Sequence, residues 1–600
     1  MLANKLLSYY QNELSYLKKK GKVFAEQFPK IARRLGMSEG TTEDPHIERV
    51  IESFALVTAQ IQQRLDEDMP EVTDALLTVL APQLLRSFPS ICIVEMTTDP
   101  KISALTASNN IAAGTELFTH PIDGNVCRFR TVYPVELQPI TLTHASLHLD
   151  DIDMSWSLKV DLRVCPGGIF NAKSLRVFLN GSNSVVNIFY TLLCSEVKKL
   201  SLSCRNERIT LPLHNIQAVG FQESEGLFSA DSRISPTHAL LQDYFYFPQK
   251  FHFIDLLLPE GFSAKSQDEL IFDIKFNPAS ITRQLGKIAD NIDADFFRLN
   301  CTPAINLFEQ RAEPIAIVPQ TAEYPVIPDI RHQDTIEVWS IDRVTAMYKQ
   351  GSETVSRPIY PLFGLEHASQ EGKSDIFWQS MRRENMTVSD SASLLFVAFS
   401  DLNEKSCAPK SEIVSLNLTC TNRDVAADMR NGDPAGDFET ELSIAGVKIN
   451  ALTRPTRSVT PPMKQAARWR LISHLSLNHM LITGPEGIRV LKETLALYNF
   501  HDNPTILRVI NLLLNIEAKP IVARLQPHDP RSLARGIEIR ITFAAAASQE
   551  VEYFLLCRFL ECFLALYAPV NSFSRVITCI EGSDDSVREW PIRAGRLLWI

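Results

Sequence analysis

The chain contains 600 residues, too many for one hydrophobic core, and this length predicts roughly three or four domains. Hydrophobic residues make up 45% and charged residues 22% of the sequence, proportions that are typical of a soluble globular protein. A formal net charge of −10 gives no general attraction to nucleic-acid phosphates or anionic lipid, so neither is expected as a partner.

The first residues and the cysteine pattern indicate in which cellular compartment the protein works. Residues 1–22 contain neither the apolar region nor the small-residue cleavage site of a signal peptide. The 11 cysteines are odd in number, scattered and without a CxxC pair. They are interpreted as reduced core residues rather than a disulfide framework or zinc site. We therefore expect a cytoplasmic protein.

Residues 1–90 are predicted to be helical. Apolar side chains recur there at alternating steps of three and four residues, the pattern of a heptad seam interrupted by a glycine. The seam comprises Leu7, Tyr10, Leu14, Leu17, Gly21, Phe24, Phe28 and Ile31. Two interpretations carry equal weight: the seam covers the chain's own domain, or it packs in a bundle with another chain. The candidate partner-interface residues are Leu7, Tyr10, Leu14, Leu17, Phe24 and Phe28.

The stretch "EDPHIERVIESFALVTAQIQQRLDEDMPEVTDALLTVLAP" contains two further helix starts. Asp44 is a suitable N-cap and Pro45 a suitable first helical residue, and a second start follows at Asp68 to Pro70. The first face comprises Ile47, Ile51, Phe54, Thr58, Ile61 and Leu65. Residues 18–34 are basic and residues 43–74 acidic, so opposite charge can guide helix pairing or simply form a solvated surface.

From about residue 91 the apolar period changes to two. "WSLKVDLRV" alternates apolar and polar residues, which predicts a half-buried antiparallel strand. Another strand carries Leu175, Val177 and Leu179 and ends at Asn180-Gly181, a tight-turn signal. Residues 91–300 and 301–455 are therefore predicted to form β-rich, antiparallel sandwich-like domains.

Residues 456–600 are predicted to form a mixed α/β domain. A helix is expected after Pro485, and "GIEIRITF" has the alternation of a strand. Residues 549–568 are apolar nearly all round but include Arg558 and Glu561, which favours a buried core helix over a membrane span. The overall expectation is a multidomain α+β protein.

The motifs of common enzymes are missing from the sequence. It contains no P-loop, no dinucleotide-binding glycine motif, no nucleophile elbow and no HExxH. His46, Glu48 and Glu52, and the pair His474 and His479, do not have the spacing of ligands on one helical face. The Asp-rich stretches "LDDIDMS" and "NRDVAADMRNGDPAGD" lack calcium-loop spacing and are interpreted as solvated loops. No catalytic, cofactor-binding or metal-binding residue is predicted.

Several blocks, in order along nearly the whole chain, together resemble the TssF baseplate-subunit family of the bacterial type VI secretion system. They begin with "YYQNELSYL", "DPHIERVIESFALVTAQIQQRLDEDMPEVTDALL", "IAAGTELFT" and "CRFRTVYPVELQPI". They continue with "CTPAINLFEQRAEPI", "EVWSIDRV", "LTCTNRD" and "RWRLISHLSLN", and close with "RGIEIRITF", "FLECFLALYAPVNSFSRV" and "REWPIRAGR".

The resemblance implies a structural role without catalysis, cofactor or small-molecule substrate. Family members resemble phage-tail wedge subunits: two copies assemble with one TssG, and this unit joins TssK and TssE around the VgrG hub. The contractile sheath is built on that platform, which docks on the membrane complex at the cytoplasmic face of the inner membrane. The implied role of the N-terminal region is helical packing between wedge subunits.

Two other function classes remain open from the residues alone. A glycan- or peptidoglycan-acting enzyme with sandwich modules is opposed by the missing export signal and by the lack of an isolated carboxylate constellation. An independent ligand-binding module is opposed by the lack of an aromatic-lined strand motif.

Overall fold

The computed structural model divides into two compact units. The smaller unit is Met1–Leu76 with Met463–Ile472, and the larger unit is Leu77–Pro462 with Ser473–Ile600. Sheets and helices combine in several domains, which confirms the predicted multidomain α+β class. The structure describes residues 10, 14, 30, 37–38, 41–42, 49–50, 52–59, 76–78, 81–98, 105–150, 153–205, 207–228, 236–278, 281–318, 321–350, 353–362, 376–384, 393–400, 413–441, 446–460, 469, 472, 486–499, 504–524, 533–550, 552–566, 568 and 572–595.

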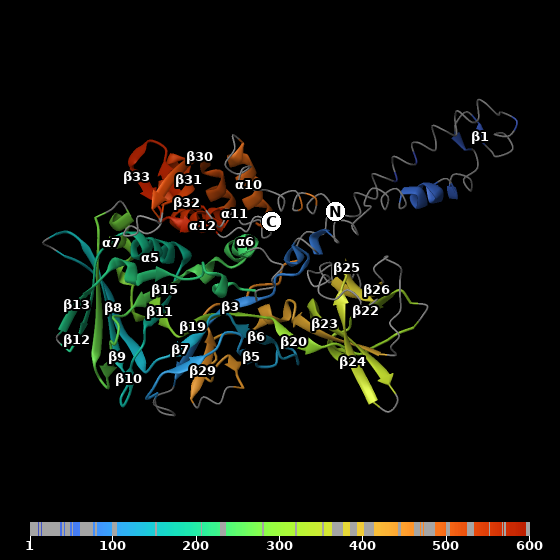
Figure 1. Cartoon of the computed structure of the whole chain (residues 1–600), viewed down its shortest axis with the longest axis horizontal. Helices are drawn as coiled ribbons and strands as arrows, with labels where there is room; N and C mark the ends of the chain where they lie inside the picture. Colours follow the sequence, from blue (N-terminus) through green and yellow to red (C-terminus); the bar gives the residue numbers. More distant parts are fainter. Residues whose placement is uncertain are drawn as a thin grey trace. The chain divides into compact units, whose positions relative to one another are not determined.

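A closed barrel joins strands that lie far apart in the sequence (Figure 1). Its order is β19 (Cys301–Ile305), β3 (Ile91–Thr98), β29 (Val447–Ala451), β28 (Phe438–Glu439), β5 (Glu116–Thr119) and β6 (Arg128–Thr131). Leu117 and Phe129 are fully buried in its core, because alternate residues of β5 and β6 face inward. The barrel thus combines strands from both predicted β-rich segments, and the boundaries near residues 300 and 455 stay predictions.

Two antiparallel sheets face each other beside the barrel as a β-sandwich. One has the order β13 (Glu207–Leu211), β12 (Val197–Cys204), β17 (Glu269–Phe276), β9 (Trp156–Val164) and β8 (Ile140–Leu149). The other has the order β14 (Ile216–Ala218), β15 (Phe253–Leu257), β11 (Ser174–Leu179) and β18 (Phe297–Leu299). Strand β9 pairs antiparallel on both sides, as the alternation of its sequence predicts.

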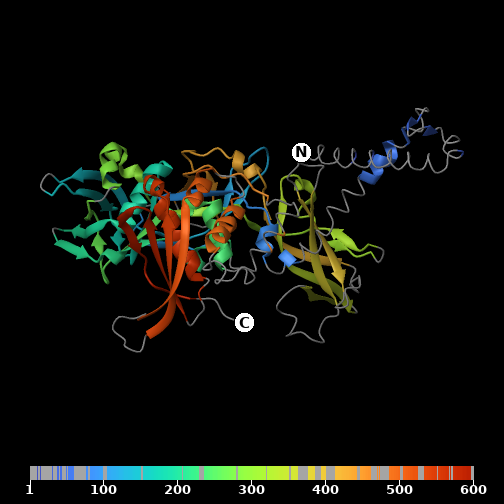
Figure 2. The same ribbon diagram turned by 90° about the horizontal axis from the view of Figure 1, so that it is seen from above.

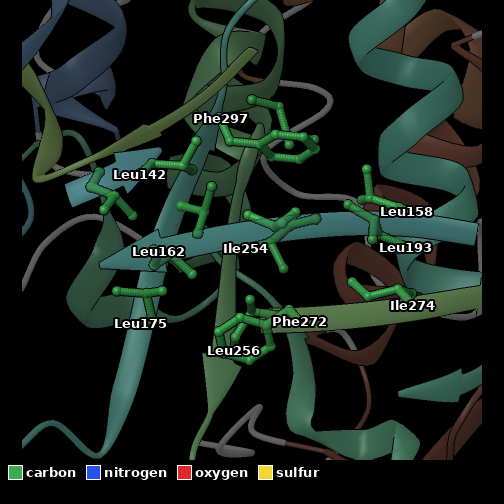
Figure 3. Close-up of a pocket in the computed structure, with 14 residues that line it drawn as sticks. Leu142, Leu158, Leu162, Leu175, Leu193, Ile254, Leu256, Phe272, Ile274 and Phe297 are labelled. Carbon is green, nitrogen blue, oxygen red and sulfur yellow. The ribbon is translucent and has the colours of Figure 1, made fainter. Parts of the chain in front are cut away.

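A small apolar cavity of about 30 Å³ lies between these sheets (Figure 3). Leu162 and Phe272 contribute from one sheet, and Leu175 and Ile254 from the other. All of its lining side chains are apolar, so a water molecule there would lack hydrogen-bond partners. The cavity is therefore a packing gap rather than a polar binding site.

The Asn180-Gly181 signal leads into a helix and not into a hairpin. Strand β11 ends at Leu179, and α5 (Asn183–Ser195) begins shortly after it. A side-chain carbon at Gly181 would lie 3.0 Å from the ring of Phe296, so the glycine allows a close approach. The β-rich prediction for residues 91–300 also did not anticipate α6 (Pro236–Tyr246), which is almost entirely buried.

A third sheet contains eight strands, all from described segments between residues 308 and 421. Its main order is β20 (Phe308–Arg311), β27 (Ile413–Thr421), β23 (Glu337–Gln350), β24 (Glu353–Pro361), β25 (Phe377–Glu384), β26 (Ser393–Ser400) and β22 (Glu323–Pro325), with β21 (Ile315–Ala316) paired to β27. Arg382 and Glu337 form a buried ion pair at 3.0 Å. The Ser87 hydroxyl also donates to Glu337, at 3.1 Å, which connects this sheet to the segment that precedes the barrel.

The C-terminal elements form a mixed sheet covered by helices (Figure 1). The strands are β30 (Leu513–Arg524), β31 (Leu533–Phe543), β32 (Phe573–Ile580), β33 (Ser583–Glu589) and β34 (Arg593–Ala594), and the helices are α10 (Gly487–Leu497), α11 (Pro504–Asn511) and α12 (Tyr553–Leu566). Strands β31 and β32 are parallel, and α12 lies between them in sequence. This parallel pair agrees with the predicted α/β character.

Helix α12 is buried between the C-terminal sheet and helices α5 and α6, as its all-round apolar sequence predicts. The ring of Phe559 stacks on Tyr244 of α6, with centroids 4.3 Å apart. Glu561 is 1% exposed and is neutralised by Arg558 and Arg593. Across the described part of the chain, no helix combines the length and apolar character that a membrane crossing needs.

Candidate partner interface

The predicted heptad seam is only partly visible. Tyr10 and Leu14 are helical and half-buried. Leu7, Leu17, Phe24 and Phe28 lie outside the described residues. The assignment of these six side chains to a partner interface therefore stays a prediction.

The next predicted helix is described at residues 49–50 and 52–59. Ser53 donates its hydroxyl hydrogen to the carbonyl of Arg49 at 2.7 Å, and Thr58 donates to Phe54 at 2.9 Å. These hydroxyls are satisfied within the helix, so neither requires a partner from another element. The small side chains of Ala55 and Ala59 are fully buried, and they define the side of the helix that the chain itself covers.

Large apolar side chains lie along another side of this helix. Val50 is 66%, Phe54 59% and Val57 53% exposed. Their spacing of four and then three residues places them in one stripe, and together with Arg49 and Ser53 they line an open depression. We call Val50, Phe54 and Val57 the N-terminal stripe. In the described structure, an apolar surface of this helix faces solvent.

The sequence pattern identified only part of this stripe. Phe54 was assigned to the apolar face, and the structure leaves it exposed. The predicted face does not include Val50 and Val57, although they lie four and three residues from Phe54, on the same side of the helix. Thr58, also on the predicted face, is half-buried. The spacing of Val50, Phe54 and Val57 by four and three residues already indicates an apolar stripe. Which side of the helix the rest of the chain covers depends on tertiary packing.

The Asp-rich stretch of residues 422–437 contains a buried carboxylate with a clear structural role. Asp437 is 2% exposed and accepts hydrogen bonds from the amides of Gly432 at 3.0 Å, Asp433 at 2.9 Å and Ala451 at 2.8 Å. The interpretation as a solvated loop is wrong at this residue, because Asp437 ties the loop to barrel strand β29. Its oxygens are occupied by backbone donors rather than presented to a ligand.

The described residues contain no group of three or more potential metal-ligating side chains. His46, His474 and His479 lie outside the described part. His238 is buried and its Nδ1 lies 2.6 Å from the Tyr498 hydroxyl. Burial lowers the pKa of His238 to about 4. Burial is the cause of this shift, and the neighbouring ring of Tyr498 belongs to the same fold, so the shift does not by itself indicate a catalytic residue.

A second buried polar cluster holds α6 in place. Lys250 and Asp243 form an ion pair whose side chains are 1% and 2% exposed. Burial raises the pKa of Asp243, and the neighbouring Lys250 ammonium opposes part of that rise. The amide of Leu227 also donates to Asp243, at 3.3 Å. The partners are other parts of the same fold, which is consistent with a structural role.

Comparisons with known proteins agree with this organisation. A family model described as "Type VI secretion system, TssF" matches residues 2–597. The type VI secretion system component TssF1 of Pseudomonas aeruginosa is 30% identical, over 98% of this chain and 99% of that protein.

Two solved structures share the fold. A chain of a TssK–TssF–TssG baseplate subcomplex, determined by cryo-electron microscopy, has a TM-score of 0.72 and 23% identity, covering 92% of this chain and 99% of that chain. A chain of a type VI secretion baseplate complex has a TM-score of 0.59 and 22% identity, covering 99% of this chain and 100% of that chain. With the family model matching almost every residue, the chain belongs to the TssF family of the type VI secretion system.

Proposed function

We propose that the chain is a structural, non-enzymatic subunit of the type VI secretion baseplate wedge, in which two copies assemble with one TssG and contact TssK and TssE. Its family membership supports this role. The N-terminal stripe carries the proposal, because three large apolar side chains on one helix are more than half exposed. A subunit of a larger assembly can cover such a surface with a neighbouring chain.

The proposal extends to the place of the wedge in the machine. Wedges surround the VgrG hub, and the contractile sheath is built on the platform that they form. The platform docks on the membrane complex at the cytoplasmic face of the inner membrane, and this chain contacts that complex only indirectly. The resemblance to the family supports these contacts.

The energy available from the stripe limits what it can do alone. Full burial of one fully exposed side chain of this kind stabilises by roughly 1.5–3 kcal/mol. The three side chains of the stripe are already partly covered, so together they contribute less than roughly 4.5–9 kcal/mol. Association costs about 4–15 kcal/mol in lost freedom of motion. The stripe therefore needs additional buried surface, and the predicted seam of Leu7, Leu14, Leu17 and Phe24 is the candidate.

Co-expression with a TssG homologue, followed by native mass measurement, tests this function. We expect a complex with two copies of this chain per TssG. Replacing Phe54 and Val57 together by serine removes apolar contact area and weakens the complex. Val126→Ser is the matched control, because Val126 is 45% exposed in the larger unit. A one-to-one complex, or equal effects of the two variants, contradicts the proposal.

The non-enzymatic part has its own test. The purified complex is incubated with peptidoglycan and with other cell-wall material, and the released soluble fragments are measured. We expect no release above that of buffer. Turnover that increases with protein concentration and survives repurification contradicts a purely structural role.

A further inference from the structure

The hairpin of β30 and β31 extends beyond the sheet to which it belongs (Figure 2). Strand β31 pairs with β32 only from Gly536 to Phe543. Residues 522–524 of β30 and 533–535 of β31 pair with each other, and among the described residues no third strand lies beside them. We call residues 520–524 and 533–537 the arm; at its base, residues 536–537 still pair with β32.

One face of the arm continues the core face of the sheet. Val522 lies directly opposite Arg535, and Arg524 opposite Leu533. Because side chains alternate along a strand, these residues share a face with Ile539, which is fully buried. Helices α10 and α11 contact β30, but Val522 and Leu533 on the arm are 59% and 62% exposed. We call Pro520, Val522, Arg524, Leu533 and Arg535 the arm face.

The charges on the two faces of the hairpin differ. On the face opposite the arm face, Glu517 stands across from Arg540, and Lys519 stands across from Glu538. Charges of opposite sign are therefore adjacent on that face. Arg524 and Arg535 are both exposed on the arm face. Among the residues that the structure describes, neither arginine has an ion-pair partner.

The position of Pro520 indicates how a partner would bind. Strand β30 is the edge of the sheet in the described structure, and a proline there removes a backbone donor that an added strand would use. Addition of a strand along this edge is therefore disfavoured. The exposed side chains instead offer a surface in which two aliphatic groups alternate with two cations. Carboxylates next to aliphatic side chains complement such a surface.

We propose that the arm face is a docking surface for a segment of a partner protein that carries carboxylates beside aliphatic side chains. This inference rests on the proposed function, because it requires the chain to work within a multi-subunit assembly. A protein partner is favoured over an anionic membrane, since the arm face presents only two cations and no aromatic side chain.

Site-specific photo-crosslinking in the complex with co-expressed baseplate subunits tests the proposal. A photoreactive phenylalanine analogue replaces Val522, and in a control chain it replaces Val587, which is 46% exposed on β33. We expect crosslinks from position 522 to one partner peptide that contains both acidic and aliphatic residues. Arg524→Glu combined with Arg535→Glu lowers the yield by at least about tenfold. Lys519→Glu, on the opposite face, leaves it unchanged.

Three outcomes overturn the proposal: position 522 crosslinks no more than position 587, the captured peptide lacks carboxylates, or Lys519→Glu reduces the yield as much as the arginine reversals. Flotation with vesicles of phosphatidylglycerol and phosphatidylcholine provides a further test, and binding that depends on Val522 and Leu533 also overturns it. The native mass of the unsubstituted complex reports on the proposed function separately. A complex of the expected mass without crosslinks at position 522 overturns the arm proposal alone.

Discussion

Replacement of Lys250 by methionine tests whether the buried ion pair with Asp243 holds α6 in place. Both side chains are at most 2% exposed, and among the described residues one carboxylate oxygen of Asp243 already lacks a hydrogen-bond partner. Removing the ammonium leaves a buried carboxylate without its counter-charge. Such a loss costs about 3–5 kcal/mol, whereas replacing both partners by neutral groups costs much less.

Hydrogen exchange measured by mass spectrometry on peptides of α6 is the assay. If the pair stabilises the segment by the stated amount, K250M accelerates exchange by roughly 10² to several 10³-fold, for amides that exchange through opening of this region. The double variant K250M/D243N keeps a carbonyl acceptor for the Leu227 amide and is the matched control. It recovers most of the protection at neutral pH.

The pH dependence gives a second and independent readout. Burial raises the pKa of Asp243 in the folded protein, and loss of Lys250 removes the main opposing influence. A carboxyl group whose pKa is raised by folding is favoured in its protonated form, so its contribution to stability is present at low pH and lost as the pH rises. The deficit of K250M relative to the parent therefore shrinks on acidification. If K250M is as protected as the double variant, or its deficit grows at low pH, the reasoning is refuted.

Three further changes have defined outcomes. Gly536→Ala destabilises the C-terminal sheet by more than about 1 kcal/mol, because the added carbon would lie 2.5 Å from Phe573. Urea unfolding measures this loss, and a midpoint equal to that of the parent would contradict it. Val177→Ile places one methylene in the apolar cavity of about 30 Å³ and raises the free energy of unfolding by up to about 0.7 kcal/mol. A lower urea midpoint would contradict this, because it would mean that the cavity cannot accept the methylene. Burial lowers the pKa of His238 in the folded protein, so the stability of the protein falls as the pH drops from 6.5 to about 4. In H238Q, the melting temperature should fall less over this pH range. An equal fall in H238Q and the parent would refute the role of His238 in this pH dependence.

The arm also shows how tertiary context changes the meaning of a pattern. "GIEIRITF" predicts a strand, and β31 is one. The same alternation cannot show where the neighbouring strand stops. Because β32 begins pairing at Gly536, the residues before it pair only with β30 in the described structure, and Leu533 becomes exposed although it shares a face with buried Ile539.

The sequence by itself determined the local structures and the family. Period-two alternation determined β9 and β31, an all-round apolar run determined the buried helix α12, and blocks spread over the chain determined membership in the TssF family. These features depend on near neighbours in the chain or on a whole-chain signature. Only the tertiary structure decided the barrel, the helices α5 and α6 within the β-rich region, and the exposure of the N-terminal stripe. The pairing of β3 with β19 and β29 joins segments hundreds of residues apart, and which face of a helix is covered depends on the elements that pack against it.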